Sequence, residues 1–153
     1  MFTLRHTAYA TATAALLGLS VVGATATATA AGQPSTISVD GSVVAGTFST
    51  TCQRQVDGIS LWMEDANNAA YGDVQAAAML RPADTVVAVT VAGTHGSASD
   101  TIGLGYNQNL HNGSAAVTKV GDTYTLTGAA DAPSSGTSFH RTKTFQITFA
   151  CPR

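Results

Sequence analysis

The sequence predicts an all-β protein, an antiparallel β-sandwich of roughly seven or eight strands that follows an N-terminal signal peptide. Two observations carry this prediction. Apolar and polar residues alternate over short runs, and clusters of Gly, Pro, Asn, Asp and Ser separate one run from the next. Alternation indicates strands with one buried and one wet face, which is typical of an antiparallel sheet and not of a doubly wound α/β fold.

Each alternating run has one side that we expect to face the core. In chain order these sides are Val44, Phe48 and Cys52; Ile59, Leu61 and Met63; Val87, Val89 and Val91; Ile102, Leu104 and Tyr106; Tyr124 and Leu126; and Phe145, Ile147, Phe149 and Cys151. Residues 73–81 (DVQAAAMLR) could form a strand or a short helix, because a run of this length does not distinguish the two.

Turn residues support the same division into strands. Val39-Asp40-Gly41 ends the first run, and Gly121-Asp122 separates AAVTKV from TYTLT as a two-residue hairpin loop would. The threonines of this hairpin are interpreted as solvent-facing strand residues.

The N-terminus has the order of a signal peptide. Residues 1–6 contain Arg5 and no acidic residue, and residues 14–23 (AALLGLSVVG) form an uncharged run shorter than the roughly 20 apolar residues that span a bilayer. Cleavage after Ala28-Thr29-Ala30 fits best, with cleavage after Ala28 or Ala31 as alternatives. A retained anchor helix is the competing interpretation. We expect a signal peptide at 1–30, a short linker at 31–36 and a β domain at 37–153.

Composition argues against two classes of partner. Without Arg5 the chain has six Lys and Arg against nine Asp and Glu, a net charge of −3, and its cations are scattered along the sequence. They are Arg54, Arg81, Lys119, Arg141, Lys143 and Arg153. We therefore expect no nucleic-acid binding. No second apolar run is long enough for a membrane span in the mature chain.

The two cysteines are most economically interpreted as one disulfide, because an exported chain meets an oxidising environment. Cys52 and Cys151 both fall on core-facing sides of their runs. A redox pair or a metal site is the alternative, but there is no C-x-x-C motif and no histidine close in sequence to either cysteine.

No catalytic grouping is evident. His95, His111 and His140 are the best candidates for a hydrolase site, yet the sequence has no G-x-S-x-G, H-E-x-x-H or Gly-rich phosphate loop. The neighbours Glu64 and Asp65 would point to opposite faces of a strand. We predict no enzyme activity, no metal and no cofactor. Asn112-Gly113-Ser114 matches a glycosylation acceptor but is more simply a turn.

Four spans follow one another in the chain: VDG (39–41), FSTTC (48–52), IGLGYNQNLHNGSAAVTKVGDTYTLTGAAD (102–131) and KTFQITFAC (143–151). In sequence and order they resemble the mycobacterial nineteen-kilodalton lipoprotein antigen family. The resemblance implies a cell-envelope, surface or secreted antigen that contacts host cells and has no established catalytic activity, and it pairs Cys52 with Cys151. Lipoprotein members carry a cysteine directly after the apolar run, whereas GLSVVGATATATAAG has none. We therefore expect no acylation of the mature N-terminus.

Three functions remain open. The first is an exported, non-catalytic antigen-like protein, monomeric, with a cell-envelope or host-surface component as its candidate partner. The second is a binding module for a small apolar or glycan ligand. Trp62 is its candidate surface contact, because it lies on the opposite face from Leu61 and Met63; a strand covered on both faces is the alternative and the one that we favour from sequence. The third is a hydrolase built from the three histidines.

Overall fold

The computed structural model describes residues 33–82, 84–93, 102–132 and 141–153, which belong to one compact unit. These residues form ten strands and one short 3-10 helix. The strands are β1 (Thr36–Val39), β2 (Ser42–Val44), β3 (Ser49–Gln55), β4 (Gly58–Asn68), β5 (Gly72–Arg81), β6 (Thr85–Gly93), β7 (Leu104–Asn107), β8 (Gly113–Val120), β9 (Thr123–Ala132) and β10 (Arg141–Ala150), and the helix is η1 (Gln108–Leu110).

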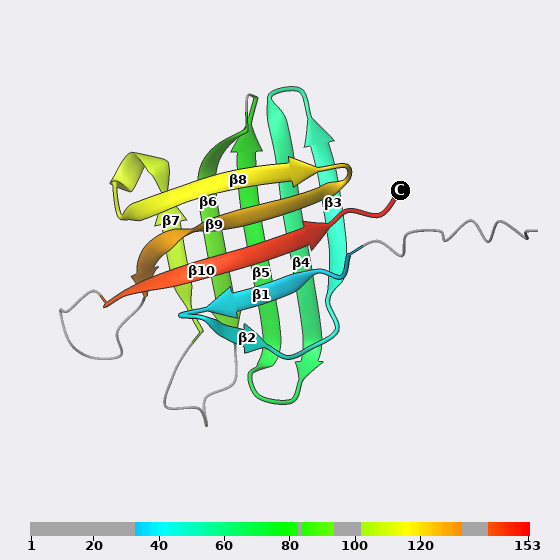
Figure 1. Cartoon of the computed structure of the whole chain (residues 1–153), viewed down its shortest axis with the longest axis vertical. Helices are drawn as coiled ribbons and strands as arrows, with labels where there is room; N and C mark the ends of the chain where they lie inside the picture. Colours follow the sequence, from blue (N-terminus) through cyan, green and yellow to red (C-terminus); the bar gives the residue numbers. More distant parts are fainter. Residues whose placement is uncertain (1–32, 83, 94–101, 133–140) are drawn as a thin grey trace, which may run out of the picture. The chain divides into compact units, whose positions relative to one another are not determined.

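The all-β, antiparallel prediction is confirmed, but the strands do not separate into the two sheets of a sandwich. They form one ten-stranded sheet in the order β2-β1-β10-β9-β7-β6-β5-β4-β3, and β8 pairs with β9. The sheet curls into a half-barrel, in which β3 to β7 cross the direction of β8, β9, β10 and β1 (Figure 1). The core lies between these two halves.

The corner between β7 and β8 keeps the two halves hydrogen-bonded to each other. β7 pairs with β6, β8 pairs with β9, and Gly105 of β7 still pairs with Asp131 of β9. The Asn112 side chain fixes the corner, because its Oδ1 accepts from Asn107 N at 2.9 Å and its Nδ2 donates to Gly105 O at 2.8 Å. This continuity explains why one curled sheet forms instead of two. Asn112 is therefore a turn residue, as the simpler interpretation held.

Most of the expected core residues are buried, and Phe48, Cys52, Ile59, Tyr106 and Cys151 are partly buried against the core. Val87 is the exception. Leu61, Met63, Leu126, Ile147 and Phe149 are 1% exposed or less. On β6 the buried residue is Val86 and not Val87, because the register to β5 shifts between the pairs Met79↔Ala88 and Leu80↔Val86. Val87 is the extra residue of this bulge, which reverses the alternation at the start of the strand.

Residues 73–81 lie in β5, which pairs with β4 on one side and β6 on the other. The two predicted turns are also present. Asp40 and Gly41 have φ angles of 49° and 77° between the paired residues Val39 and Ser42, and Gly121 has a φ of 59° in the turn from β8 to β9. A left-handed backbone at both central residues suits a tight hairpin, which explains the Asp-Gly sequence.

Candidate functional site

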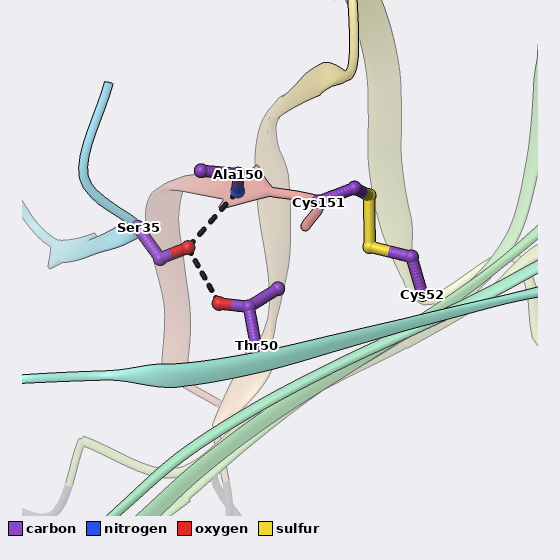
Figure 2. Close-up of a disulfide and its surroundings, with 5 residues drawn as sticks. All are labelled: Ser35, Thr50, Cys52, Ala150 and Cys151. Carbon is purple, nitrogen blue, oxygen red and sulfur yellow. Dashed lines mark hydrogen bonds between the residues drawn. A yellow bond between two sulfur atoms is a disulfide. The ribbon is translucent and has the colours of Figure 1, made fainter. Parts of the chain in front are cut away.

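The predicted disulfide joins Cys52 of β3 to Cys151, which directly follows β10 (Figure 2). Both residues pack against the core. Beside the bond, Ser35 Oγ accepts from Ala150 N at 2.9 Å and lies 2.6 Å from Thr50 Oγ1. Since the sequence contains only these two cysteines, no thiol remains free. The bond therefore ties β3 to the end of β10.

Trp62 lies on the outer face of the sheet in β4 and keeps 40% of its surface exposed. Its cross-strand partners are Thr51 of β3 and Ala77 of β5. The preference for a strand covered on both faces is thus not supported at this position. Trp62 instead lines a groove of about 510 Å³.

The groove arises from the alternation of large and small side chains across four strands. Met79 pairs with Ala88 and with Ser60, while Ala77 pairs with Thr90 and with Trp62. The alanines leave a hollow beside the large Trp62 and Met79 side chains.

The polar lining of the groove is uncharged. It consists of Thr51, Gln53, Ser60 and Thr90. Ser60 Oγ accepts from Gln55 Nε2 at 3.0 Å, so part of this lining is already oriented. An aromatic ring with hydroxyl and amide groups beside it can stack on a ligand and hydrogen-bond its edges.

The candidate catalytic residues are not brought together among the described residues. His111 is exposed and ends η1 with a φ of 52°, and His95 and His140 lie outside the described residues. Asp65 accepts from Thr47 N at 3.3 Å and from Asn68 Nδ2 at 3.1 Å, so it supports a loop, while Glu64 is exposed.

Two further features concern metals and membranes. Within the described ranges, no three His, Cys, Asp or Glu side chains gather closely enough to hold a metal ion. The part of the chain that the structure describes also contains no helix long and apolar enough to cross a membrane.

Sequence reasoning missed a second groove, of about 210 Å³, which gathers Arg54, Arg81 and Lys119. These cations are scattered in sequence, but each lies near the turn end of a different hairpin. The hairpins are β3–β4, β5–β6 and β8–β9. The sequence shows that each cation lies beside a turn. The ends of the three hairpins come together only because the sheet curls.

These features define a small, disulfide-linked, antiparallel all-β domain with an aromatic groove on its outer face. The family model of the Mycobacterium 19 kDa lipoprotein antigen matches residues 28–151, and the chain belongs to this family. A comparison with curated proteins finds no match. Family membership confirms the resemblance seen in the sequence and places the chain among envelope-associated or secreted proteins. The family is described as an antigen and not as an enzyme.

Proposed function

We propose that this protein is an exported, non-catalytic domain of the cell envelope or its surroundings, and that it acts by binding a neutral glycan in the groove beside Trp62. The observation that carries the proposal is the 40% exposure of this tryptophan in a hollow with an uncharged polar lining. Large aromatic side chains are usually withdrawn from water, so one at the edge of a hollow marks a candidate contact.

The lining favours a sugar over a purely apolar ligand. A sugar ring offers a C–H face that can stack on the indole and hydroxyl groups that can bond to Gln53, Thr51 and Thr90. An apolar ligand would remove these polar groups from water without giving them partners, which costs about 1 to 3 kcal/mol for each group. A charged ligand would find no opposite charge in this lining.

The same lining supports a binding role without catalysis. Among the described residues, no histidine, carboxylate or lysine lines the groove beside the hydroxyl groups of Ser60, Thr51 and Thr90. Activation of a hydroxyl nucleophile requires such a base within hydrogen-bond reach. The description of the family as an antigen agrees with this role.

Trp62 is the single tryptophan of the chain, so its fluorescence reports on this groove alone. We expect titration with neutral oligosaccharides of gluco-, manno- and galacto-configuration to give a saturable change in emission for at least one of them. Calorimetry should show that Trp62→Ala weakens the binding about tenfold or more, because truncation of an aromatic anchor costs more than about 1 kcal/mol.

Leu110→Ala is the matched control, since Leu110 is 71% exposed and does not line the groove. This variant should bind as the parent does. If the protein binds hexanol and no oligosaccharide, the ligand of this groove is apolar and the glycan proposal is wrong. Glycan binding that survives Trp62→Ala would remove the groove as its site.

A further inference from the structure

The cationic groove is a second site, separate from the groove beside Trp62. It contains three of the seven Lys and Arg residues of a chain whose net charge is −2, and it shares no lining residue with the Trp62 groove. Arg54 comes from β3, Arg81 from β5 and Lys119 from β8. This concentration of positive charge on an acidic chain indicates a binding site for an anion.

Two of the cations lie on core-facing sides of their strands, above the end of the core. Arg54 is two residues from Cys52, and Lys119 is two residues from Val117; both neighbours pack against the core. Lys119 Nζ lies 5.2 Å from the centre of the Tyr124 ring. Leu80 and Tyr124 also line the groove, but they are only 2% and 4% exposed, so the base of the groove offers a ligand little apolar surface.

The described residues form no ion pair with Arg54, Arg81 or Lys119. Asp84 also lines the groove, which leaves the lining with a net charge of +2. Two other nearby carboxylates do not line it: Asp57 lies in the β3–β4 turn, and Asp122 pairs with Arg153 at 3.3 Å. The groove therefore keeps a net positive charge that a bound anion would neutralise.

We propose that this groove binds the phosphate group of a phosphate ester between Arg54, Arg81 and Lys119. A phosphate monoester carries a charge of about −1.5 to −2 at neutral pH, which matches the net charge of the lining. Two guanidinium groups can bind phosphate oxygens in pairs, and lysine adds a point charge. A volume of about 210 Å³ is enough for one such group.

Titration of the isotope-labelled exported protein, followed by NMR, tests the site with inorganic phosphate and with hexyl phosphate. We expect saturable shifts of the backbone amides near Arg54, Arg81 and Lys119. Hexyl phosphate and inorganic phosphate should bind with similar affinity, because both present a phosphate group to the cations and the nearly buried Leu80 and Tyr124 add little apolar contact. Binding of both should weaken as the salt concentration rises.

Arg54→Gln should weaken the binding of hexyl phosphate about fivefold or more, because it removes a charge-assisted hydrogen bond. Arg141→Gln removes the same charge from an exposed position outside the groove and should leave binding unchanged. Equal weakening of binding by the two variants would show that the net charge of the protein, and not this groove, attracts the phosphate, and would overturn the site. The absence of saturable shifts would overturn it as well.

The ester can be a soluble molecule or the headgroup of a phospholipid. Sedimentation with vesicles of phosphatidylcholine, with and without phosphatidylglycerol, distinguishes these sources. Sedimentation that requires phosphatidylglycerol and is lost in Arg54→Gln identifies a headgroup, whereas binding of hexyl phosphate without sedimentation identifies a soluble ester. Sedimentation without any binding of hexyl phosphate would overturn the groove as the phosphate site.

Discussion

Cys52 and Cys151 are 99 residues apart in sequence, yet their Cα atoms lie 5.6 Å apart and a disulfide joins their side chains. The bond ties β3, one end of the strand order, to the residue that follows β10. The pairing of Gly105 with Asp131 connects the same two halves through β7 and β9. The curled sheet is therefore held by backbone hydrogen bonds at its corner and by a covalent bond between β3 and the end of β10.

Removal of this disulfide should lower the stability of the domain substantially. In the chain-entropy model a closed loop of about 100 residues is worth about 4.7 kcal/mol, and we expect the Cys52→Ala Cys151→Ala variant to lose about 2 to 5 kcal/mol. Chemical denaturation, followed by circular dichroism, measures the loss. A reducing agent should lower the unfolding midpoint of the parent and leave that of the double variant unchanged. Alkylation of both cysteines in the native, unreduced protein would contradict the prediction.

Asn68→Ala should destabilise the fold by about 1 to 3 kcal/mol, because it removes three partly buried hydrogen bonds to the backbone. Asn68 is 5% exposed, its Nδ2 donates to Ala45 O at 2.6 Å, and its Oδ1 accepts from the amides of Ala70 and Tyr71, each at 3.1 Å. One side chain thus links the segment before β3 to the β4–β5 turn.

The neighbouring residue provides the control for this prediction. Asn67 is exposed, and Asn67→Ala makes the same change of side chain. Thermal unfolding of both variants should show a lower midpoint for Asn68→Ala and a nearly unchanged one for Asn67→Ala. Equal midpoints would show that the hydrogen bonds of Asn68 contribute nothing to stability.

Asn112→Ala should loosen the corner that joins β7 to β8. The substitution removes the acceptor for Asn107 N and the donor to Gly105 O, and we expect a loss of about 1 to 3 kcal/mol. The rate of hydrogen exchange should increase most at the amides of residues 105–113. Asn109→Ala, in the exposed helix η1, is the matched control and should leave these amides protected. Unchanged exchange at the corner in Asn112→Ala would contradict the role of this side chain.

Sequence alternation predicted the buried faces well, because a strand places every second side chain on the same side whatever sheet it joins. This rule correctly placed Leu61 and Met63 in the core, and it placed both cysteines where a disulfide could form. It failed at Val87, since a bulge inserts one residue and shifts the alternation. A bulge depends on the pairing with β5, which the sequence of β6 alone does not contain.

The number of sheets and the cationic groove could not be predicted from the sequence, for a different reason. The sheet stays continuous where Gly105 pairs with Asp131, and Asn112 holds this corner through hydrogen bonds that no alternation pattern encodes. Arg54 and Lys119 meet only after the sheet has curled. Local patterns therefore identify strands and faces, whereas sites made by several hairpins require the tertiary structure.

We expect signal peptidase to cleave at or within two residues of Ala30 and to leave an unacylated N-terminus. Cleavage there retains Ser35, whose Oγ accepts from Ala150 N, so the folded part keeps its contacts beside the disulfide. Thioether acylation needs a thiol at the new N-terminus, but Cys52 and Cys151 are the two cysteines of the sequence and both are bonded. Intact mass spectrometry of protein recovered from cells and from medium measures both features. A mass that includes the first 30 residues would indicate a retained anchor, and a mature mass raised by a fatty acyl group would contradict the prediction directly.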